Sequence, residues 1–242
     1  MKKIYFYMMI AAVVLTTACN KNGDEPIIEP GPNQMIMTTQ QSNVIIIMAG
    51  SGTVTIDWGD KMEIETYPLL DFNDFGWQNY NHIFSGSSIH TITITGNNIT
   101  RFACLSTGTT QMDFSRNPEL TVMSCGDNLL KSLDVSSNTK LMALDCFGNF
   151  LTNLDVSKNT ELGYLNFRNN QLTKLDVSTN SNLMTLHCRD NLLTAEALNA
   201  MFETLHDIMF PGRTKIIYIG ANPGTNDCNR SIAENKGWIV YD

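Results

Sequence analysis

The chain has 242 residues, of which 43% are hydrophobic and 17% are charged, and its formal net charge is −8 at pH 7. A chain of this length can bury a sizeable core, either as one elongated domain or as two small ones. The acidic balance argues against nucleic acid as a partner, because phosphate backbones favour clustered lysine and arginine.

The first residues have the pattern of an export signal. Lys2 and Lys3 precede an apolar run over residues 4–15, which is shorter than the ~20 residues of a membrane-spanning helix but suits the core of a signal peptide. The following segment, LTTAC, ends at Cys19 and resembles a bacterial lipoprotein signal. The resemblance implies removal of residues 1–18 and acylation of Cys19, whereas a simple secretory signal is the alternative.

Residues 19–34 read as a tether, since prolines, glycines and charged residues are interspersed there. Asn20, Asp24 and Glu25 resemble the residues that follow the cysteine in lipoproteins sent to an outer membrane. We therefore expect a lipid anchor in the outer membrane, at the cell surface. The sequence leaves open whether the protein faces the periplasm or the exterior.

Residues 35–98 are expected to form a small β domain. NVIIIMAG, GTVTIDWGD and IHTITITG alternate apolar and polar residues and are separated by glycine, serine and asparagine. The segment VTIDWGD, followed by YNHIF, resembles the signatures of PKD-like β-sandwiches, with Lys61 in place of the usual glycine.

Residues 99–194 repeat with a period of 21 residues. The aligned first positions of the five units are Ile99, Leu120, Leu141, Leu162 and Leu183. Each unit has two similar halves, LxxLxCxxNxL and LxxLDVSxN, the pattern of leucine-rich repeats, whose stacked units share one core. The sequence therefore predicts a mainly β fold, a solenoid of parallel strands with one coil per unit.

Equivalent positions of successive coils form columns. Two leucine and valine columns are expected in the core: Leu133, Leu154, Leu175, Val135, Val156 and Val177. Two asparagine columns are expected to bond the backbone groups that turns leave unpaired: Asn128, Asn149, Asn170 and Asn191, and Asn117, Asn138, Asn159 and Asn180.

Four cysteines share one column, which holds Cys104, Cys125, Cys146 and Cys188. Parallel strands about 4.8 Å apart hold aligned Cβ atoms further apart than the ~3.8 Å of a disulfide. A linear column also cannot converge four ligands on one zinc ion. We expect a structural ladder of free buried thiols, with no metal and no cofactor, and Cys228 stays unassigned.

The 21-residue unit with its cysteine column resembles the internalin-like leucine-rich-repeat proteins of bacterial surfaces. The match covers residues 89–194. The resemblance implies a curved solenoid whose strand face binds a partner, commonly a host or matrix macromolecule. Thr107 and Thr109 stand where the repeat has asparagine and leucine, so we expect an irregular turn in the first coil.

Both ends of a solenoid expose apolar side chains and strand edges, so we expect both to be covered. The β domain of residues 35–98 is placed to cover the first coil. Residues 195–242 predict an α/β cap, with an amphipathic helix followed by a strand, a short helix and a closing strand. Thr194 is the expected N-cap, and the apolar face of the helix holds Leu198, Met201, Phe202 and Leu205.

Nothing in the sequence resembles a catalytic motif around the histidines, so we expect no enzyme activity. One aspartate column recurs with the repeat: Asp113, Asp134, Asp155 and Asp176. These side chains either cap turns through hydrogen bonds to the backbone or bind cations, and the sequence leaves this open.

Function is expected on the strand face, among outward residues that vary from coil to coil. The partner-binding candidates are Asp145, Phe147, Tyr164, Arg168, His187 and Arg189. Aromatic and arginine side chains are frequent interface anchors, although an ordinary solvated face would look similar. We expect adhesion or recognition of a protein or glycoprotein, with no prediction of oligomeric state. The alternative is a glycan-binding accessory protein that uses aromatic residues of the β domain or of the strand face.

Overall fold

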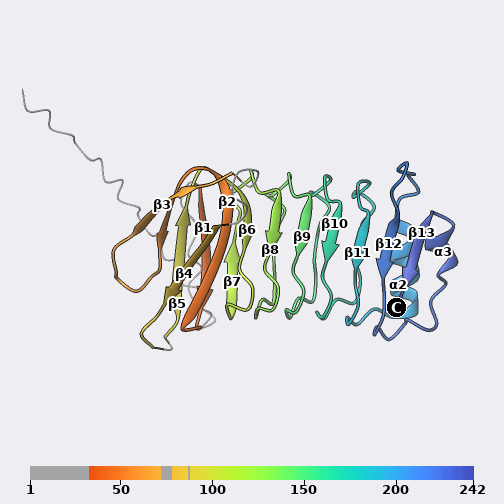
Figure 1. Ribbon diagram of the computed structural model, residues 1–242. Helices are drawn as coiled ribbons and strands as arrows, with labels where there is room; N and C mark the ends of the chain where they lie inside the picture. Colours follow the sequence, from red (N-terminus) through yellow and green to blue (C-terminus); the bar gives the residue numbers. More distant parts are fainter. Residues whose placement is uncertain (1–32, 72–77, 87) are drawn as a thin grey trace, which may run out of the picture.

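The computed structural model describes residues 33–71, 78–86 and 88–242, which form a solenoid of stacked coils with a β domain at its N-terminal end (Figure 1). The predicted signal, Cys19 and nearly all of the tether lie outside the described residues. In the described part of the chain, no helix is long and apolar enough to cross a membrane.

The elements are described in chain order. The β domain contains β1 (Gln34–Thr39), β2 (Asn43–Asp57), β3 (Glu65–Leu69), β4 (Gln78–Ile83) and β5 (His90–Thr95). The repeats contain β6 (Asn98–Ala103), β7 (Thr109–Asp113), β8 (Val122–Ser124), β9 (Ala143–Asp145), β10 (Tyr164–Asn166) and β11 (Thr185–His187). The C-terminal segment contains α2 (Ala195–Thr204), β12 (Lys215–Tyr218), α3 (Ser231–Glu234) and β13 (Trp238–Tyr241).

The mainly β solenoid is confirmed. Strands β6 and β8 to β13 lie side by side in one parallel sheet, with each coil contributing one strand (Figure 1). The middle residues of these strands pair in register, point inward and are almost wholly buried: Phe102, Met123, Leu144, Leu165, Leu186 and Ile217. The 21-residue period thus holds each apolar side chain directly above its equivalent in the coil before it.

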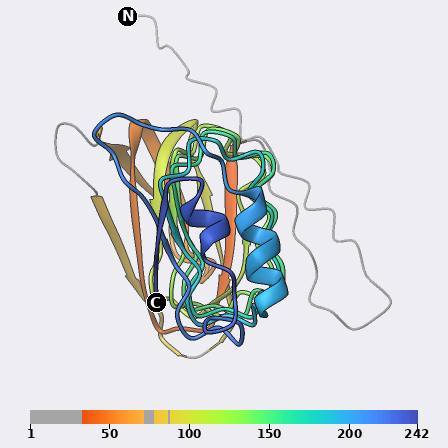
Figure 2. The same ribbon diagram turned by 90° about the vertical axis from the view of Figure 1, so that its right-hand side faces the viewer.

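The two strands predicted in the C-terminal segment are present, and they extend the solenoid sheet, a pairing that the sequence pattern did not predict. Strand β12 pairs parallel with β11, and β13 pairs parallel with β12. Helix α2 lies within the coil between β11 and β12, on the side of the solenoid opposite the strands (Figure 2). The predicted N-cap is confirmed, because the Ala197 backbone N–H donates to Thr194 Oγ1 at 3.2 Å, and the four apolar residues of the helix face are buried.

The β domain covers the first coil on both sides by main-chain pairing. On the strand face, the middle of β2 pairs antiparallel with β6, with an irregularity between Ala49 and Gly50. On the opposite side, β1 pairs antiparallel with β7. The second half of β2 continues into the other sheet, where it pairs with β3 and β5. The long β2 strand therefore joins the two sheets of the β domain to the solenoid.

The asparagine column that follows the strands bonds the turns as predicted. Asn149 Nδ2 donates to the carbonyls of Cys125 and Cys146 at 3.0 and 3.1 Å, and Asn149 Oδ1 accepts from Leu130 N–H at 3.0 Å. Asn222 repeats this arrangement in the last coils, with its Nδ2 on the Cys188 carbonyl at 2.9 Å. Each amide therefore ties its own turn to the turn of the preceding coil.

The opposite asparagine column satisfies only half of its groups. Asn138 Nδ2 donates to the carbonyls of Phe114 and Asn117 at 3.0 and 2.9 Å, and the later asparagines repeat the pattern. The side-chain oxygens of this column are buried without a hydrogen-bond partner among the described residues. The prediction of turn bonding therefore holds here for the amide nitrogens alone.

The turn of the first coil is irregular, as expected. Gly108 has a φ of 61°, a left-handed conformation that glycine adopts without strain. Asn128 Oδ1 accepts from the backbone N–H groups of Thr107 and Thr109 at 3.1 and 3.0 Å. The Thr109 bond is equivalent to the bond between Leu130 N–H and Asn149 Oδ1 in the next coil, whereas the Thr107 bond is additional and replaces part of the bonding that an asparagine at position 107 would supply.

Candidate functional site

The register of the parallel strands arranges the outward residues of the strand face in rows. One row is largely apolar and is continued by Ile216 and Ile239 of the last strands: Val122, Ala143, Tyr164, Thr185, Ile216 and Ile239. The neighbouring row, which we call the central row, is polar and then aromatic: Ser124, Asp145, Asn166, His187, Tyr218 and Tyr241. The six predicted candidates lie in these two rows and in the positions just after the strands.

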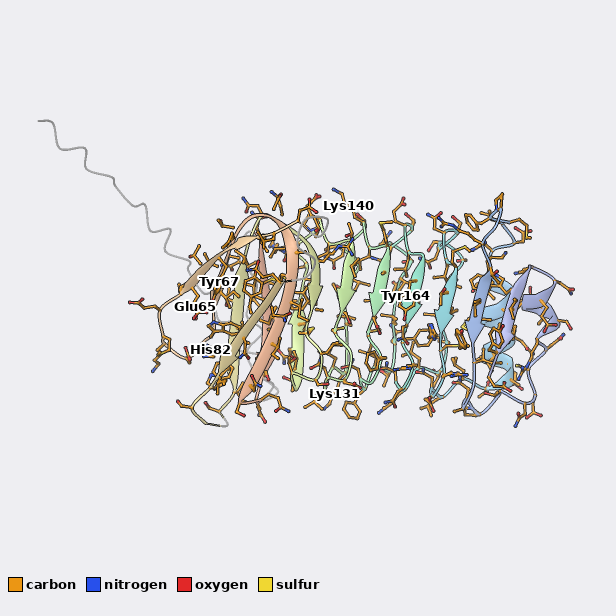
Figure 3. The ribbon with its side chains drawn as sticks, in the orientation of Figure 1. Glu65, Tyr67, His82, Lys131, Lys140 and Tyr164 are labelled. Carbon is orange, nitrogen blue, oxygen red and sulfur yellow. The ribbon has the colours of Figure 1, made fainter. Side chains whose placement is uncertain are left out.

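Aromatic rings stack along the last coils of the central row. The His187 and Tyr218 rings are parallel, with an interplanar angle of 8° and centroids 4.4 Å apart. Tyr241 stacks on Tyr218 with centroids 5.4 Å apart, and Tyr164, near the middle of the strand face in Figure 3, approaches His187 at 5.6 Å. Two of the candidates, Tyr164 and His187, therefore belong to a longer aromatic file.

Tyr218 and Tyr241 were missed by the sequence analysis. Both follow coils whose lengths depart from the 21-residue period, so extrapolating the repeat does not bring them into the row. The alternation within KIIY and WIVY could have indicated that these tyrosines share one face of their strands, but only the pairing of β12 with β11 shows which row they join.

Phe147 and Arg168 form a second group, at the positions just after β9 and β10. The Phe147 ring lies over Gly126, where a Cβ atom would come within 2.2 Å of the ring. The Arg168 guanidinium carbon lies 4.8 Å from the Phe147 ring centroid. Because Gly126 has no side chain, the Phe147 ring fits above it, and the ring in turn contacts the Arg168 guanidinium.

Arg189 leans in the opposite direction, toward the C-terminal coils. Its guanidinium carbon lies 5.1 Å from the Tyr218 ring centroid, and a Cβ at Gly220 would come within 3.5 Å of Arg189 Nε. The Nε atom is buried and has no hydrogen-bond partner among the described residues. The candidates thus form two groups, one centred on Phe147 and one on Tyr218.

Burial shifts the pKa values of two side chains in the central row, Asp145 and His187. It raises the pKa of the Asp145 carboxyl, although the Phe147 backbone N–H and Arg168 oppose this. It also lowers the pKa of His187, with further contributions from Arg168 and Arg189. The neutral form of His187 is therefore favoured near pH 7, and the two arginines carry the positive charge of this region.

The four ladder cysteines are free, fully buried and at equivalent positions of their coils. Burial raises the pKa of Cys125 to about 12 and raises the pKa values of the other three thiols as well. Such thiols behave as small apolar side chains rather than as nucleophiles. Cys228 lies outside the column, half-buried and free.

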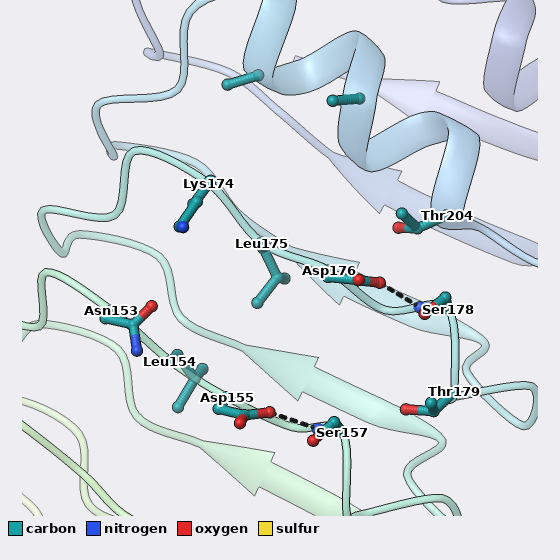
Figure 4. Close-up of a pocket in the computed structure, with 12 residues that line it drawn as sticks. Asn153, Leu154, Asp155, Ser157, Lys174, Leu175, Asp176, Ser178, Thr179 and Thr204 are labelled. Carbon is teal, nitrogen blue, oxygen red and sulfur yellow. Dashed lines mark hydrogen bonds between the residues drawn. The ribbon is translucent and has the colours of Figure 1, made fainter.

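The aspartate column caps turns. Each carboxylate accepts a hydrogen bond from the backbone N–H of the serine two residues later, as Asp155 does from Ser157 at 2.9 Å and Asp176 from Ser178 at 2.8 Å (Figure 4). Turn capping, one of the two alternatives raised by the sequence, is therefore observed. In the described part of the chain, no group of three or more histidine, cysteine, aspartate or glutamate side chains is arranged to hold a metal ion.

Two concave sites lie away from the strand face. A groove of about 560 Å³ runs beneath α2, and Leu154 and Leu175 of the repeats line it together with Ala197 and Ala200 of the helix (Figure 4). A second pocket, of about 540 Å³, lies on the β domain beside Glu65, Tyr67 and His82 (Figure 3). Glu65 accepts hydrogen bonds there from Trp58 Nε1 at 2.7 Å and from the Tyr67 hydroxyl at 2.6 Å, so its carboxylate is already engaged.

No family model and no curated protein matches the chain. Among solved structures, the functional domain of InlJ from Listeria monocytogenes, described as including a cysteine ladder, is 22% identical, with a TM-score of 0.46 over 57% of this chain and 33% of that one. The internalin InlF from the same organism is 19% identical, with a TM-score of 0.37 over 54% of this chain and 44% of that one. The Leptospira interrogans leucine-rich-repeat protein LIC12759 is 15% identical, with a TM-score of 0.34 over 53% and 44%. This chain thus spans less than half the length of each of these structures.

Proposed function

We propose that this protein is a non-enzymatic cell-surface lipoprotein that recognises a protein or glycoprotein through its strand face, in adhesion. The observation that carries the proposal is the gathering of six non-repeating aromatic and arginine side chains into two contacting groups on adjacent coils. These are Phe147, Tyr164, Arg168, Arg189, Tyr218 and Tyr241. Such side chains carry much of the binding energy in protein interfaces, and the apolar row beside them adds area to bury.

The arrangement of the rings favours a protein surface over a glycan. Sugars bind aromatic side chains by stacking on a ring face, but the faces of His187 and Tyr218 are turned toward one another. In the β domain, Trp58, Tyr80 and Phe84 are buried. The ring edges and tyrosine hydroxyls that remain suit the mixed polar and apolar contacts of a protein partner.

The anchor forms a separate part of the proposal. Cys19 would be acylated and would hold the chain in the outer membrane, with residues 19–34 as the tether and a PKD-like β domain before the repeats. Incorporation of labelled palmitate into the chain, lost in Cys19→Ala, tests the anchor. Protease treatment of intact cells would then distinguish an exterior from a periplasmic position.

The net charge of −8 supports a partner other than nucleic acid.

Capture of partners from host-surface extracts tests the recognition role. Phe147→Ala combined with Tyr164→Ala should weaken capture at least tenfold while leaving the melting temperature within a few degrees, because both side chains lie on the surface. Leu129→Ala combined with Phe150→Ala removes two other exposed apolar side chains from the repeats and is the control. Equal capture by both double variants would overturn the strand-face proposal.

A further inference from the structure

We propose that the partner presents carboxylates on an extended peptide segment, which Arg168 and Arg189 bind as a pair of guanidinium clamps. This inference rests on the proposed function, because it assigns the chemistry of the partner at the same face. It concerns two strand-face positions at which a guanidinium lies on an aromatic ring.

The two guanidiniums are held apart and supported. Arg168 lies on the ring of Phe147 from the preceding coil, whereas Arg189 lies on the ring of Tyr218 from the following coil. Stacking on a ring occupies one face of a guanidinium and leaves its edge free to bind a carboxylate in a bidentate manner. At Arg189, where Nε is buried, the two terminal nitrogens would form these bonds. A side chain held in this way loses little conformational freedom on binding.

Neither arginine is neutralised by an ion pair. The ion pairs observed at His82, Lys140, Arg230 and Lys236 include neither of them. The acidic side chain of the central row, Asp145, interacts electrostatically with Arg168 but lies outside ion-pair distance. In a chain with a net charge of −8, two arginines on adjacent coils that lie outside ion pairs can complement an acidic partner.

The surroundings of the arginines favour a peptide over an acidic polysaccharide. The apolar row passes beside the site through Ala143 and Tyr164 and continues to Ile216 and Ile239, of which Ile239 is 43% exposed. A polysaccharide of uronic acids or sulfated sugars has anionic groups but few apolar groups to cover this row. A segment that carries both acidic and apolar side chains would complement both features.

Panning of the full-length protein with a display library of random dodecapeptides tests the inference, with binding of heparin and polygalacturonic acid measured in parallel. We expect the enriched peptides to be rich in aspartate and glutamate. Synthetic copies should bind Arg168→Gln and Arg189→Gln about tenfold more weakly or worse. Arg116→Gln, which removes an exposed arginine from the turn after β7, is the matched control and should bind normally.

The other outcomes separate the inference from the proposed function. If enriched peptides lack acidic residues and lose affinity for Tyr164→Ala but not for Arg168→Gln, the strand face is a binding site and the acidic partner is wrong. If only heparin or polygalacturonic acid binds in an arginine-dependent manner, the partner is a glycan and the peptide assignment is wrong. If no peptide or glycan binds, or if binding is unchanged in every strand-face variant, both proposals are overturned.

Discussion

The Phe147 ring fills the space above Gly126 so closely that a Cβ at position 126 would lie 2.2 Å from Phe147 Cε1. Because the contact involves the far end of a rotatable side chain, Gly126→Ala should displace the ring at little cost to folding. Displacement would remove the support of Arg168 and weaken partner binding about tenfold or more, while the unfolding free energy would change by less than about 1 kcal/mol.

Titration calorimetry or surface binding measurements on Gly126→Ala check this expectation, with a captured partner or an enriched peptide as the ligand. Gly163→Ala is the control, because a Cβ there would make only ordinary contacts, with its nearest atom at 3.6 Å. Unchanged binding by Gly126→Ala, with the ring visibly moved, would mean that Phe147 does not take part in recognition.

Asn149→Ala should destabilise the solenoid strongly. The substitution removes the donor to the carbonyls of Cys125 and Cys146 and the acceptor of the Leu130 N–H, and it leaves these groups buried. At about 1–3 kcal/mol for each unsatisfied group, we expect a loss of about 3 kcal/mol or more. Denaturant unfolding measures the loss. Asn153→Ala, on the exposed surface of the same coil, should change stability by less than about 0.5 kcal/mol.

Ala221→Gly should stabilise the protein. In the asparagine column that follows the strands, the residue before each asparagine adopts a left-handed conformation. Glycine, asparagine or aspartate occupies this position in most coils. In the last coil the residue is Ala221, with a φ of 58°. The left-handed conformation costs a residue with a Cβ about 1–2 kcal/mol, while glycine adds about 0.5–1 kcal/mol of unfolded-state entropy. The expected net gain is about 0.5–1 kcal/mol. A melting temperature unchanged or lowered by Ala221→Gly would contradict the strain argument.

The buried thiols should make stability fall in alkaline solution. Burial raises the pKa of Cys125 to about 12, while an exposed thiol of the unfolded chain titrates near ~8.5. The Cys125 thiol therefore stays protonated in the folded state at a pH where it has ionised in the unfolded state. Its contribution to the unfolding free energy is intact below about pH 8.5 and is lost as the pH rises toward the pKa of the folded state.

Comparison with Cys125→Ala isolates this effect from the tyrosines that also titrate at high pH. Between pH 8.5 and pH 10.5, the unfolding free energy of the native chain should fall more steeply than that of the variant, by up to about 1.4 kcal/mol per pH unit. Parallel curves for the two proteins would show that Cys125 is accessible to solvent in the folded state.

The sequence predicted the coils because the repeat leaves few alternatives. A fixed 21-residue step stacks each residue on its equivalent, so the columns of leucine, asparagine and cysteine follow directly from the alignment of Ile99 with the leucines of the later units. Turn capping by Asp155 and its equivalents was one of two alternatives that the repeat suggested, and the hydrogen bond to the serine two residues later shows capping.

Three features depend on geometry that the sequence pattern does not carry. Tyr218 joins the aromatic file only because coils of different lengths return to the same register. The packing of Phe147 over Gly126 depends on a side-chain rotamer. In the opposite asparagine column, the side-chain oxygens have no hydrogen-bond partner among the described residues, as at Asn138 Oδ1. This depends on the direction in which each amide faces its neighbouring coil.

Site-specific photocrosslinking tests the recognition surface most directly. A benzoylphenylalanine at Thr185, on the strand face beside Tyr164, should crosslink the bound partner. The same group at Thr179, in the groove beneath α2 on the opposite side, should not. Crosslinks from position 179 alone, with equal partner capture by both proteins, would contradict recognition through the strand face.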